Sequence, residues 1–151
     1  MEIQHVHVDK QSPAVYKAMI GVATSATALA RDAGLTRGLV ELINVRVSQI
    51  SGCATCLDVH VRKADAAGVT SRQLATLSQW RETDLFDDRE QAALRLAEIT
   101  ATLPDHDTAE REYARARAVL TDDEVSAVVW VAIAIGAFNR VSILSRHPVR
   151  P

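Results

Sequence analysis

Three observations predict an all-α fold of about seven helices in a single domain. Apolar residues make up 48% of the 151 residues and aromatic residues only 4%, so small and branched aliphatic side chains fill the core. This composition favours packed helices over a β-sandwich. Residues that cap and break helices recur along the chain, and no segment after the ninth residue shows a sustained alternation of apolar and polar positions.

The N-terminal residues are the part of the chain without a helical pattern. Ile3, Val6 and Val8 alternate with polar residues, which predicts a short extended arm within residues 1–11. The helical domain then covers residues 12–151. The start of the chain lacks a basic segment followed by an apolar run, so no secretory signal is expected and the predicted location is cytoplasmic.

Capping signals predict seven helices in the rest of the chain. Proline stands at the first position of the first helix, and threonine or aspartate precedes most of the others, often with Glu or Gln three residues later. The predicted helices begin at Ser12-Pro13, Thr36, Cys53, Thr70, Asp87, Asp107 and Thr121. Their predicted ends include Gly34, Ile50, Gly68, Trp80, Pro104 and His147.

The last predicted helix is the most apolar segment. Its apolar run from Val125 to Phe138 is too short to cross a bilayer and stops at Asn139-Arg140, so we expect a core helix and no membrane partner. Because apolar side chains lie on nearly every face, this helix should be buried all round. The first helix is also apolar from Val15 to Ala30 and needs cover, which predicts a homo-oligomer.

Charge and cysteine content narrow the function. The net charge of −2, with basic residues interspersed among acidic ones, gives no support for nucleic-acid binding. Only two cysteines are present, three positions apart, which is unlike a secreted disulfide scaffold. Such a pair in an intracellular-looking chain indicates thiol redox chemistry or half of a metal site.

The cysteine pair lies at the predicted start of a helix. Gly52 breaks the preceding helix, so Cys53 falls in the first turn of the next one and Cys56 lies one turn further. The positive end of the helix dipole favours thiolates there. The two sulfurs are also close enough to form a small disulfide ring, in which one sulfur attacks and the other resolves the product.

His60 and Glu41 complete a predicted relay. His60 follows Cys56 by four residues on the same helix face, so its imidazole can accept the thiol proton. If the two helices form an antiparallel hairpin, Glu41 lies roughly 15 Å and His60 roughly 12 Å from the turn, at a rise of about 1.5 Å per residue. The two residues are nearly level, so Glu41 is expected to orient His60 and stabilise its charge.

Other interpretations are open at this stage. Two buried structural thiols would explain the cysteine pair, and the four residues have the side-chain types of a zinc site, although three ligands on one helix are awkwardly placed. We expect neither a metal nor a cofactor. The other histidines lie in arms or at helix ends and are expected to be solvated; they are His5, His7, His106 and His147.

The pattern resembles the alkylhydroperoxidase D-like proteins of the carboxymuconolactone decarboxylase superfamily. That family carries a Glu, eleven residues, Cys-x-x-Cys, three residues and a His, a pattern that this sequence reproduces in every spacing with Glu41, Cys53, Cys56 and His60. The resemblance covers nearly the whole chain. The flanking residues that agree are Glu41-Leu42, Ser48-Gln49-Ile50, Gly52, Ala64, Gly68, Trp80-Arg81, Phe86 to Glu98 and Phe138-Asn139-Arg140.

The resemblance implies an all-α fold and a homo-oligomer, often a trimer or a hexamer. It implies reduction of a hydroperoxide by the cysteine pair, with a dithiol such as dihydrolipoamide or a lipoyl protein as the electron donor. Cys56 would attack the peroxide, and Cys53 would resolve the intermediate and meet the donor. Some members carry a second His directly before the latter cysteine, where this chain has Thr55, which cannot relay a proton as imidazole does.

The estimated energies of the helix dipole and of a positioned base also favour Cys56 as the first cysteine to react. The dipole favours a thiolate at a helix start by about 0.3–1 kcal/mol, whereas a positioned base lowers a barrier by about 3–5 kcal/mol. Cys56 is therefore predicted to react first, and Cys53, at the more open helix end, to exchange with the donor. The alternative functions are a disulfide reductase, a redox sensor and a cofactor-free lactone decarboxylase, the last of which does not need the cysteine pair.

Overall fold

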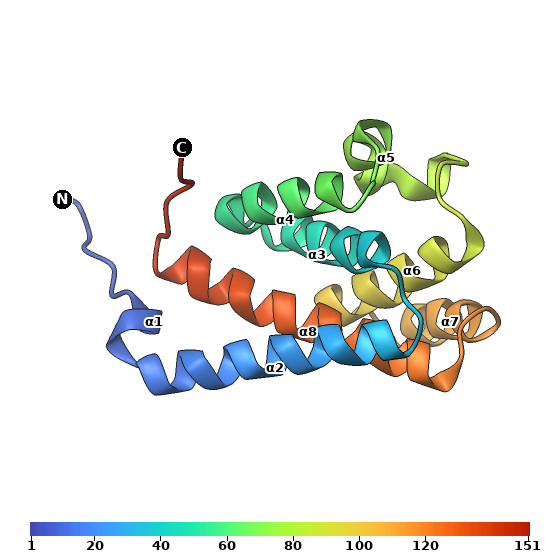
Figure 1. Cartoon of the computed structure of the whole chain (residues 1–151), viewed down its shortest axis with the longest axis horizontal. Coiled ribbons are helices and arrows are strands. Elements are labelled where there is room, and N and C mark those ends of the chain that lie inside the picture. The colour runs from blue at the N-terminus through green and yellow to red at the C-terminus, as the bar shows by residue number, and fades with distance from the viewer.

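The computed structural model describes residues 1–151, and every regular element in it is a helix (Figure 1). The predicted all-α fold is therefore confirmed. In chain order the elements are α1 (Val8–Gln11), α2 (Pro13–Asp32), α3 (Arg37–Ser51), α4 (Ala54–Ala66), α5 (Ser71–Thr76), the 3-10 helix η1 (Leu77–Glu82), α6 (Asp88–Thr102), α7 (His106–Arg117) and α8 (Asp122–Leu144).

The long helices pack around α8. This helix contacts α2, α3 and α6, and α3 also forms a hairpin with α4. Figure 1 shows α2 and α8 running antiparallel along the molecule, with both chain termini at one end. The main core lies between α2, α3, α6 and α8 and includes both cysteines. A smaller core around Trp80 fills the space between α3, α4, η1 and α6.

Helix α8 is the core helix that its composition predicts. The apolar run alone is too short to cross a bilayer, but the whole helix of 23 residues is long and apolar enough by length and composition. In this structure it packs against three other helices. Burial all round is wrong for the single chain, because Trp130 and Ile133 are 48% and 42% exposed. The helix continues past the end of the apolar run to Leu144. Asn139, which follows that run, is buried, and its amide donates to the hydroxyl of Ser48 at 3.0 Å.

The predicted caps explain most helix starts. Four predicted capping side chains accept a backbone N–H at the start of α3, α5, α6 and α8; they are Thr36, Thr70, Asp87 and Thr121. The expected start of α7 at Asp107 is wrong, because Asp105 caps this helix two residues earlier. Val8 begins the one-turn helix α1 instead of extending the arm. The helix expected to end near Trp80 tightens into η1 from Leu77.

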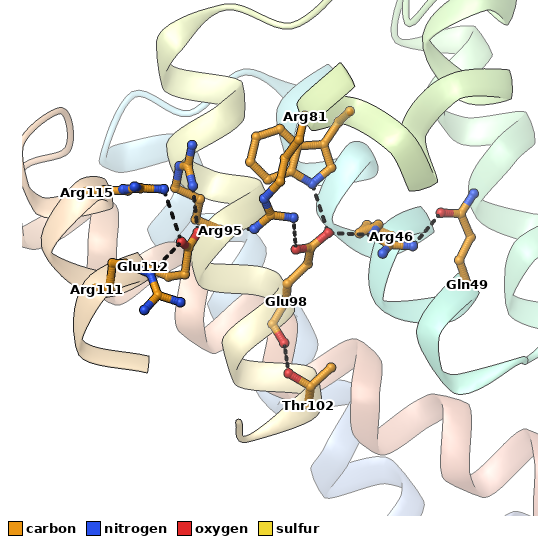
Figure 2. Close-up of polar contacts among 10 residues, drawn as sticks. Arg46, Gln49, Arg81, Arg95, Glu98, Thr102, Arg111, Glu112 and Arg115 are labelled. Atoms are coloured by element: carbon orange, nitrogen blue, oxygen red, sulfur yellow. Dashed lines mark hydrogen bonds and ion pairs between the residues drawn. The ribbon is translucent and has the colours of Figure 1, made fainter. Parts of the chain in front are cut away.

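A network of arginines and two glutamates ties α3, η1, α6 and α7 together (Figure 2). Glu98 of α6 accepts from Arg46 of α3 at 2.9 Å and from Arg81 of η1 at 2.6 Å. Trp80 donates its indole N–H to the same carboxylate at 2.8 Å. This one side chain therefore links three elements.

Glu112 of α7 is surrounded by four guanidinium groups in the same network (Figure 2). Arg95 and Arg81 lie 2.6 and 3.1 Å from its Oε2, and Arg115 and Arg111 lie 3.4 and 3.9 Å from its Oε1. Burial alone would raise the pKa of the two glutamates of the network. Hydrogen bonds and charges of the arginines outweigh burial, so the pKa of both carboxyls lies below the ordinary value of 4.5.

Candidate active site

A tight turn between α3 and α4 sets the position of the cysteines. Gly52 follows α3 with φ at 73°, in the left-handed region that side chains disfavour. Its N–H and that of Cys53 both donate to the carbonyl of Ser48, at 2.9 and 3.1 Å. The chain therefore reverses within two residues, and α4 begins at Ala54.

Cys53 is the N-cap of α4 rather than a residue of its first turn. Its sulfur accepts from the N–H of Cys56 at 3.3 Å, one of the N–H groups that a helix start leaves unpaired. The two cysteines form a disulfide, with their Cα atoms 5.3 Å apart. In this oxidised form neither sulfur is a thiolate, so the pair does not offer the zinc ligands considered from the sequence.

The two sulfurs differ in their access to the surface. Both residues are buried in the main core, Cys53 at 1% and Cys56 at 6% exposed, but Cys56 also lines a cavity and Cys53 does not. The expectation that Cys53 lies at the more open helix end is therefore wrong. The reason is the cap position, which holds the sulfur of Cys53 against the backbone of its own helix.

Glu41 and His60 meet, as an antiparallel hairpin of α3 and α4 predicts. Nδ1 of His60 lies 2.7 Å from Oε2 of Glu41. Asn44, one turn further along α3, donates to the same oxygen at 3.4 Å. Asn44 was not predicted as a site residue, although its position three residues after Glu41 on one helix face was a signal for this contact.

The surroundings of this pair determine its protonation. Burial alone would raise the pKa of Glu41, but the hydrogen bond and charge of His60, helped by Asn44 and Lys63, outweigh burial and place the pKa below 4.5. An ionised carboxylate only accepts hydrogen bonds, so Nδ1 of His60 carries a proton. In the neutral imidazole, Nε2 then holds the lone pair and is the atom that can take a proton from a thiol.

Cys56, His60 and Glu41 line one cavity of about 1270 Å³. Apolar side chains from α2 and α8 form much of the remaining wall, among them Ala26, Val131 and Ile135. Three of the four predicted site residues therefore share a space with apolar surface. The fourth, Cys53, is joined to them through its disulfide with Cys56.

Both chain ends also reach the cavity. Thr55 donates its hydroxyl to the backbone carbonyl of His147 at 2.7 Å. The ring of His147 lies 3.1 Å from Asp9 and packs against His7, with ring centroids 5.7 Å apart. The expectation that His5, His7 and His147 are solvated is wrong, since all three are half-buried, whereas His106 is exposed as expected. Nothing in the sequence pattern indicated that residues so far apart would meet.

Comparison with known proteins places this site in a family. The model of the carboxymuconolactone decarboxylase family matches residues 13–98, which include all four predicted site residues. This chain belongs to that family. The uncharacterized protein YdfG of Bacillus subtilis is 33% identical over 113 residues, or 75% of this chain and 77% of that protein. The uncharacterized protein YnjA of Escherichia coli is 32% identical over 63 residues, or 42% of this chain and 35% of that protein.

The fold of this carboxymuconolactone decarboxylase family member also occurs in a solved structure. That structure is ATU0492 from Agrobacterium tumefaciens, described as a protein of unknown function and a candidate antioxidant defence protein AhpD. The two superpose with a TM-score of 0.85 over 99% of each chain, at 24% sequence identity. The match shows that the two proteins share the AhpD-like helical fold.

Proposed function

We propose that this protein is a thiol peroxidase, in which Cys56 and Cys53 reduce an organic hydroperoxide and are then reduced by a dithiol. The observation that carries the proposal is the disulfide-forming pair beside a partly buried Glu41–His60 pair on the wall of one cavity. A sulfur that attacks peroxide needs a base nearby and room for the substrate. The Glu, Cys-x-x-Cys and His spacing that this family member shares with the AhpD-like proteins supports the same chemistry, whereas a lactone decarboxylase would not need the cysteine pair.

The first half of the proposed cycle oxidises Cys56. Nε2 of His60 takes the thiol proton, and the thiolate attacks the terminal oxygen of the hydroperoxide. The O–O bond breaks, Cys56 becomes a sulfenic acid, and the leaving alkoxide takes the proton back and departs as an alcohol. Glu41 holds the imidazole in the required tautomer and stabilises the imidazolium that forms between these steps.

Cys53 then closes the disulfide. Its sulfur lies at the start of α4, where the helix dipole and the N–H of Cys56 favour a thiolate. The thiolate attacks the sulfur of the sulfenic acid and displaces hydroxide, which takes up one proton and leaves as water. The product of this step is a disulfide between the same two residues that the structure joins.

The buried position of Cys53 changes the expected route of reduction. Because Cys56 is the sulfur on the cavity, we propose that a donor thiolate attacks Cys56 and expels Cys53 as a thiolate. The helix start that favours the Cys53 thiolate also makes it a good leaving group. The second donor thiol then displaces Cys56, and the donor departs as a cyclic disulfide, as dihydrolipoamide or a lipoyl protein does.

The cavity wall favours an organic hydroperoxide over hydrogen peroxide. Val40, Val131 and Phe138 offer apolar surface that an alkyl group buries and hydrogen peroxide does not. One turnover converts a hydroperoxide and a dithiol into an alcohol, water and a cyclic disulfide, so no further reactant is needed.

We also propose that the chain works as a homo-oligomer, a trimer or a hexamer as its resemblance implies. Large apolar side chains on α2 and α8 are exposed on the single chain; they include Val15, Ile20, Val22, Trp130 and Ile133. Further copies of the chain would cover this surface. Light scattering at micromolar concentration should give a mass several times 16.4 kDa, and the monomer mass would contradict the proposal.

Peroxide consumption with dihydrolipoamide as the donor tests the peroxidase. The wild-type protein should turn over cumene hydroperoxide with one dithiol oxidised per peroxide, and faster than hydrogen peroxide. Cys56→Ser should abolish the reaction, and Cys53→Ser should react once per chain and then stop. If one equivalent of peroxide leaves the mass of the reduced wild-type protein unchanged, the proposal is wrong.

A matched pair of variants separates the relay from folding. Glu41→Gln keeps the size of the side chain and an acceptor for His60 but removes the charge, so the oxidation step should slow while the helical content stays the same. Glu110→Gln makes the same change on an exposed position of α7 and should leave the rate unchanged.

A further inference from the structure

Both chain termini lie at one end of the molecule (Figure 1), and the segments beside them supply a second group of polar side chains. His7 precedes α1, Asp9 lies within α1, and His147 follows α8. One nitrogen or oxygen of each residue lies within 4.8 Å of those of the other two. They come together because α8 returns antiparallel to α2 and brings the chain back to its start.

His147 and Asp9 already have nearly the spacing of two metal ligands. Nε2 of His147 lies 3.1 Å from Oδ1 of Asp9. In a tetrahedral zinc site with bonds of about 2.0–2.1 Å, the ligand atoms lie about 3.4 Å apart. Nδ1 of His147 lies 3.3 Å from the hydroxyl of Ser142. Nε2 now donates to the Asp9 carboxylate. Once a metal ion takes the place of that proton, Nδ1 can donate to the Ser142 hydroxyl, which is the usual arrangement behind a metal-binding histidine.

His7 provides an independent sign of a missing partner. Its Nδ1 is buried and has no hydrogen-bond partner. Buried polar atoms without a partner are rare in proteins and call for an explanation. The ring of His7 lies against that of His147, so a ligand shared with His147 is within its reach.

Asp9 has the charge that a metal ligand needs. Its side chain is only 15% exposed, and its Oδ1 lies 3.1 Å from Nε2 of His147. A carboxylate is one of the oxygen ligands that zinc binds.

We propose that His7, Asp9 and His147 bind a divalent transition-metal ion, specifically Zn²⁺. Two imidazoles and one carboxylate form a ligand set that zinc uses in sites with an open fourth position. All three residues line the cavity that also contains Cys56, so water or an oxygen of a bound molecule can fill the fourth position. The ligand atoms, now within 4.8 Å, draw in to about 3.4 Å when the ion binds.

The proposed ion would clamp the two ends of the chain beside the cysteine-bearing helix. His147 is already held to α4 by the hydrogen bond from Thr55, the residue before Cys56. The zinc site contains no cysteine, so the proposal stands independently of the peroxidase activity.

Zinc titration of the untagged, chelator-treated protein in its disulfide form tests the site, because oxidised cysteines do not supply thiolate ligands. Calorimetry or competition with a zinc-binding dye should give one ion per chain. Asp9→Asn and His147→Ala should each weaken binding at least about 10–100-fold, and Ser142→Ala about 10-fold, as loss of a supporting hydrogen bond does. The same changes on α7, Asp107→Asn and His106→Ala, should leave affinity unchanged.

Two further measurements test whether a loss of zinc binding comes from misfolding and whether zinc binds at the cysteines. Asp9 lies in a one-turn helix near the chain start, so Asp9→Asn should keep the wild-type circular dichroism and yet lose the rise in melting temperature that zinc produces. A protein carrying both Cys53→Ser and Cys56→Ser should bind zinc as the wild type does. The proposal is overturned if the wild type binds no stoichiometric zinc, or if Asp9→Asn and His147→Ala bind it as tightly.

Discussion

Glu41 and Glu112 have equally buried side chains, but their carboxylates bind different kinds of partner. Each side chain is 9% exposed. Glu112 meets four arginines, which stay charged at any pH that the fold survives (Figure 2). Glu41 meets one histidine and one amide at the wall of a cavity.

The nature of the partner separates a structural carboxylate from a proposed catalytic one. The pKa of both carboxyls lies below 4.5, so a lowered pKa does not distinguish them. The permanent charges around Glu112 fix how α6, α7 and η1 pack. The imidazole of His60 can take up a proton from a thiol, so the charge of Glu41 can stabilise an imidazolium that exists only during a reaction. The feature that distinguishes the proposed catalytic carboxylate is a titratable partner that faces a cavity.

The largest predicted effect follows from removing the titratable partner. His60→Ala should slow the oxidation of Cys56 by about 10²–10⁴-fold, which is the usual contribution of a positioned base. Stopped-flow mixing of the reduced protein with cumene hydroperoxide measures this rate. His106→Ala, an exposed histidine on α7, is the control. An unchanged rate in His60→Ala would mean that Cys56 reacts without this base.

Removing the charge of Glu112 should instead cost stability. Glu112→Gln leaves Arg95 without a carboxylate partner and leaves Arg81 with Glu98 alone, so we expect the free energy of unfolding to fall by about 1–3 kcal/mol. Urea unfolding followed by circular dichroism measures the loss. Glu41→Gln should cost less stability but slow peroxide consumption, which Glu112→Gln should leave unchanged at room temperature. If Glu41→Gln instead lost more stability and Glu112→Gln slowed peroxide consumption, the structural and catalytic roles would be assigned the wrong way round.

The pH dependence of stability should show the same network. Because the pKa of Glu98 and Glu112 lies below 4.5 in the folded protein, their ionised forms favour the folded state. This stabilisation is fully present above about pH 5 and is lost as the pH falls through the lower folded pKa. Glu112→Gln should therefore lose less stability than the wild type between neutral and acidic pH. If the free energy of unfolding falls equally with pH in the two proteins, Glu112 does not contribute to this pH dependence.

The smallest effect should come from one arginine at the edge of the network. The Arg111 guanidinium lies 3.9 Å from Glu112 and is half-exposed. Arg111→Ala should change the free energy of unfolding by less than about 0.5 kcal/mol, because exposed ion pairs contribute little and three arginines remain. A loss as large as that of Glu112→Gln would show that the network depends on every member.

Local signals predicted the helices and the Glu41–His60 contact. Caps such as Thr36 act within one turn, and the hairpin geometry depends only on helix rise, so both can be derived from spacing. The start of α7 was misplaced because Asp105 and Asp107 carry the same capping carboxylate, and only the folded chain selects between them. The arginine network was not predicted because it joins elements that no sequence period relates.

The parts of the site that the sequence could not predict depend on long-range packing. Cys53 is buried in its position as the N-cap of α4. A helix that started one residue earlier would have Cys53 in its first turn, as the sequence predicted. The meeting of His7 with His147 requires the whole path of α2 and α8. Thr55, where the resemblance allows a histidine, uses its hydroxyl to hold the C-terminal segment, a contact that no spacing indicates.

The most direct test of the central claim is to identify which sulfur meets the peroxide. Reduced Cys53→Ser and Cys56→Ser are each treated with one equivalent of cumene hydroperoxide and trapped with dimedone, and the adducts are located by mass spectrometry. Cys56 lies on the cavity one turn from His60, and Cys53 is buried, so Cys53→Ser should be labelled rapidly at Cys56 and Cys56→Ser should stay unlabelled. Labelling of Cys53 in Cys56→Ser at the rate of the wild-type oxidation would contradict the account.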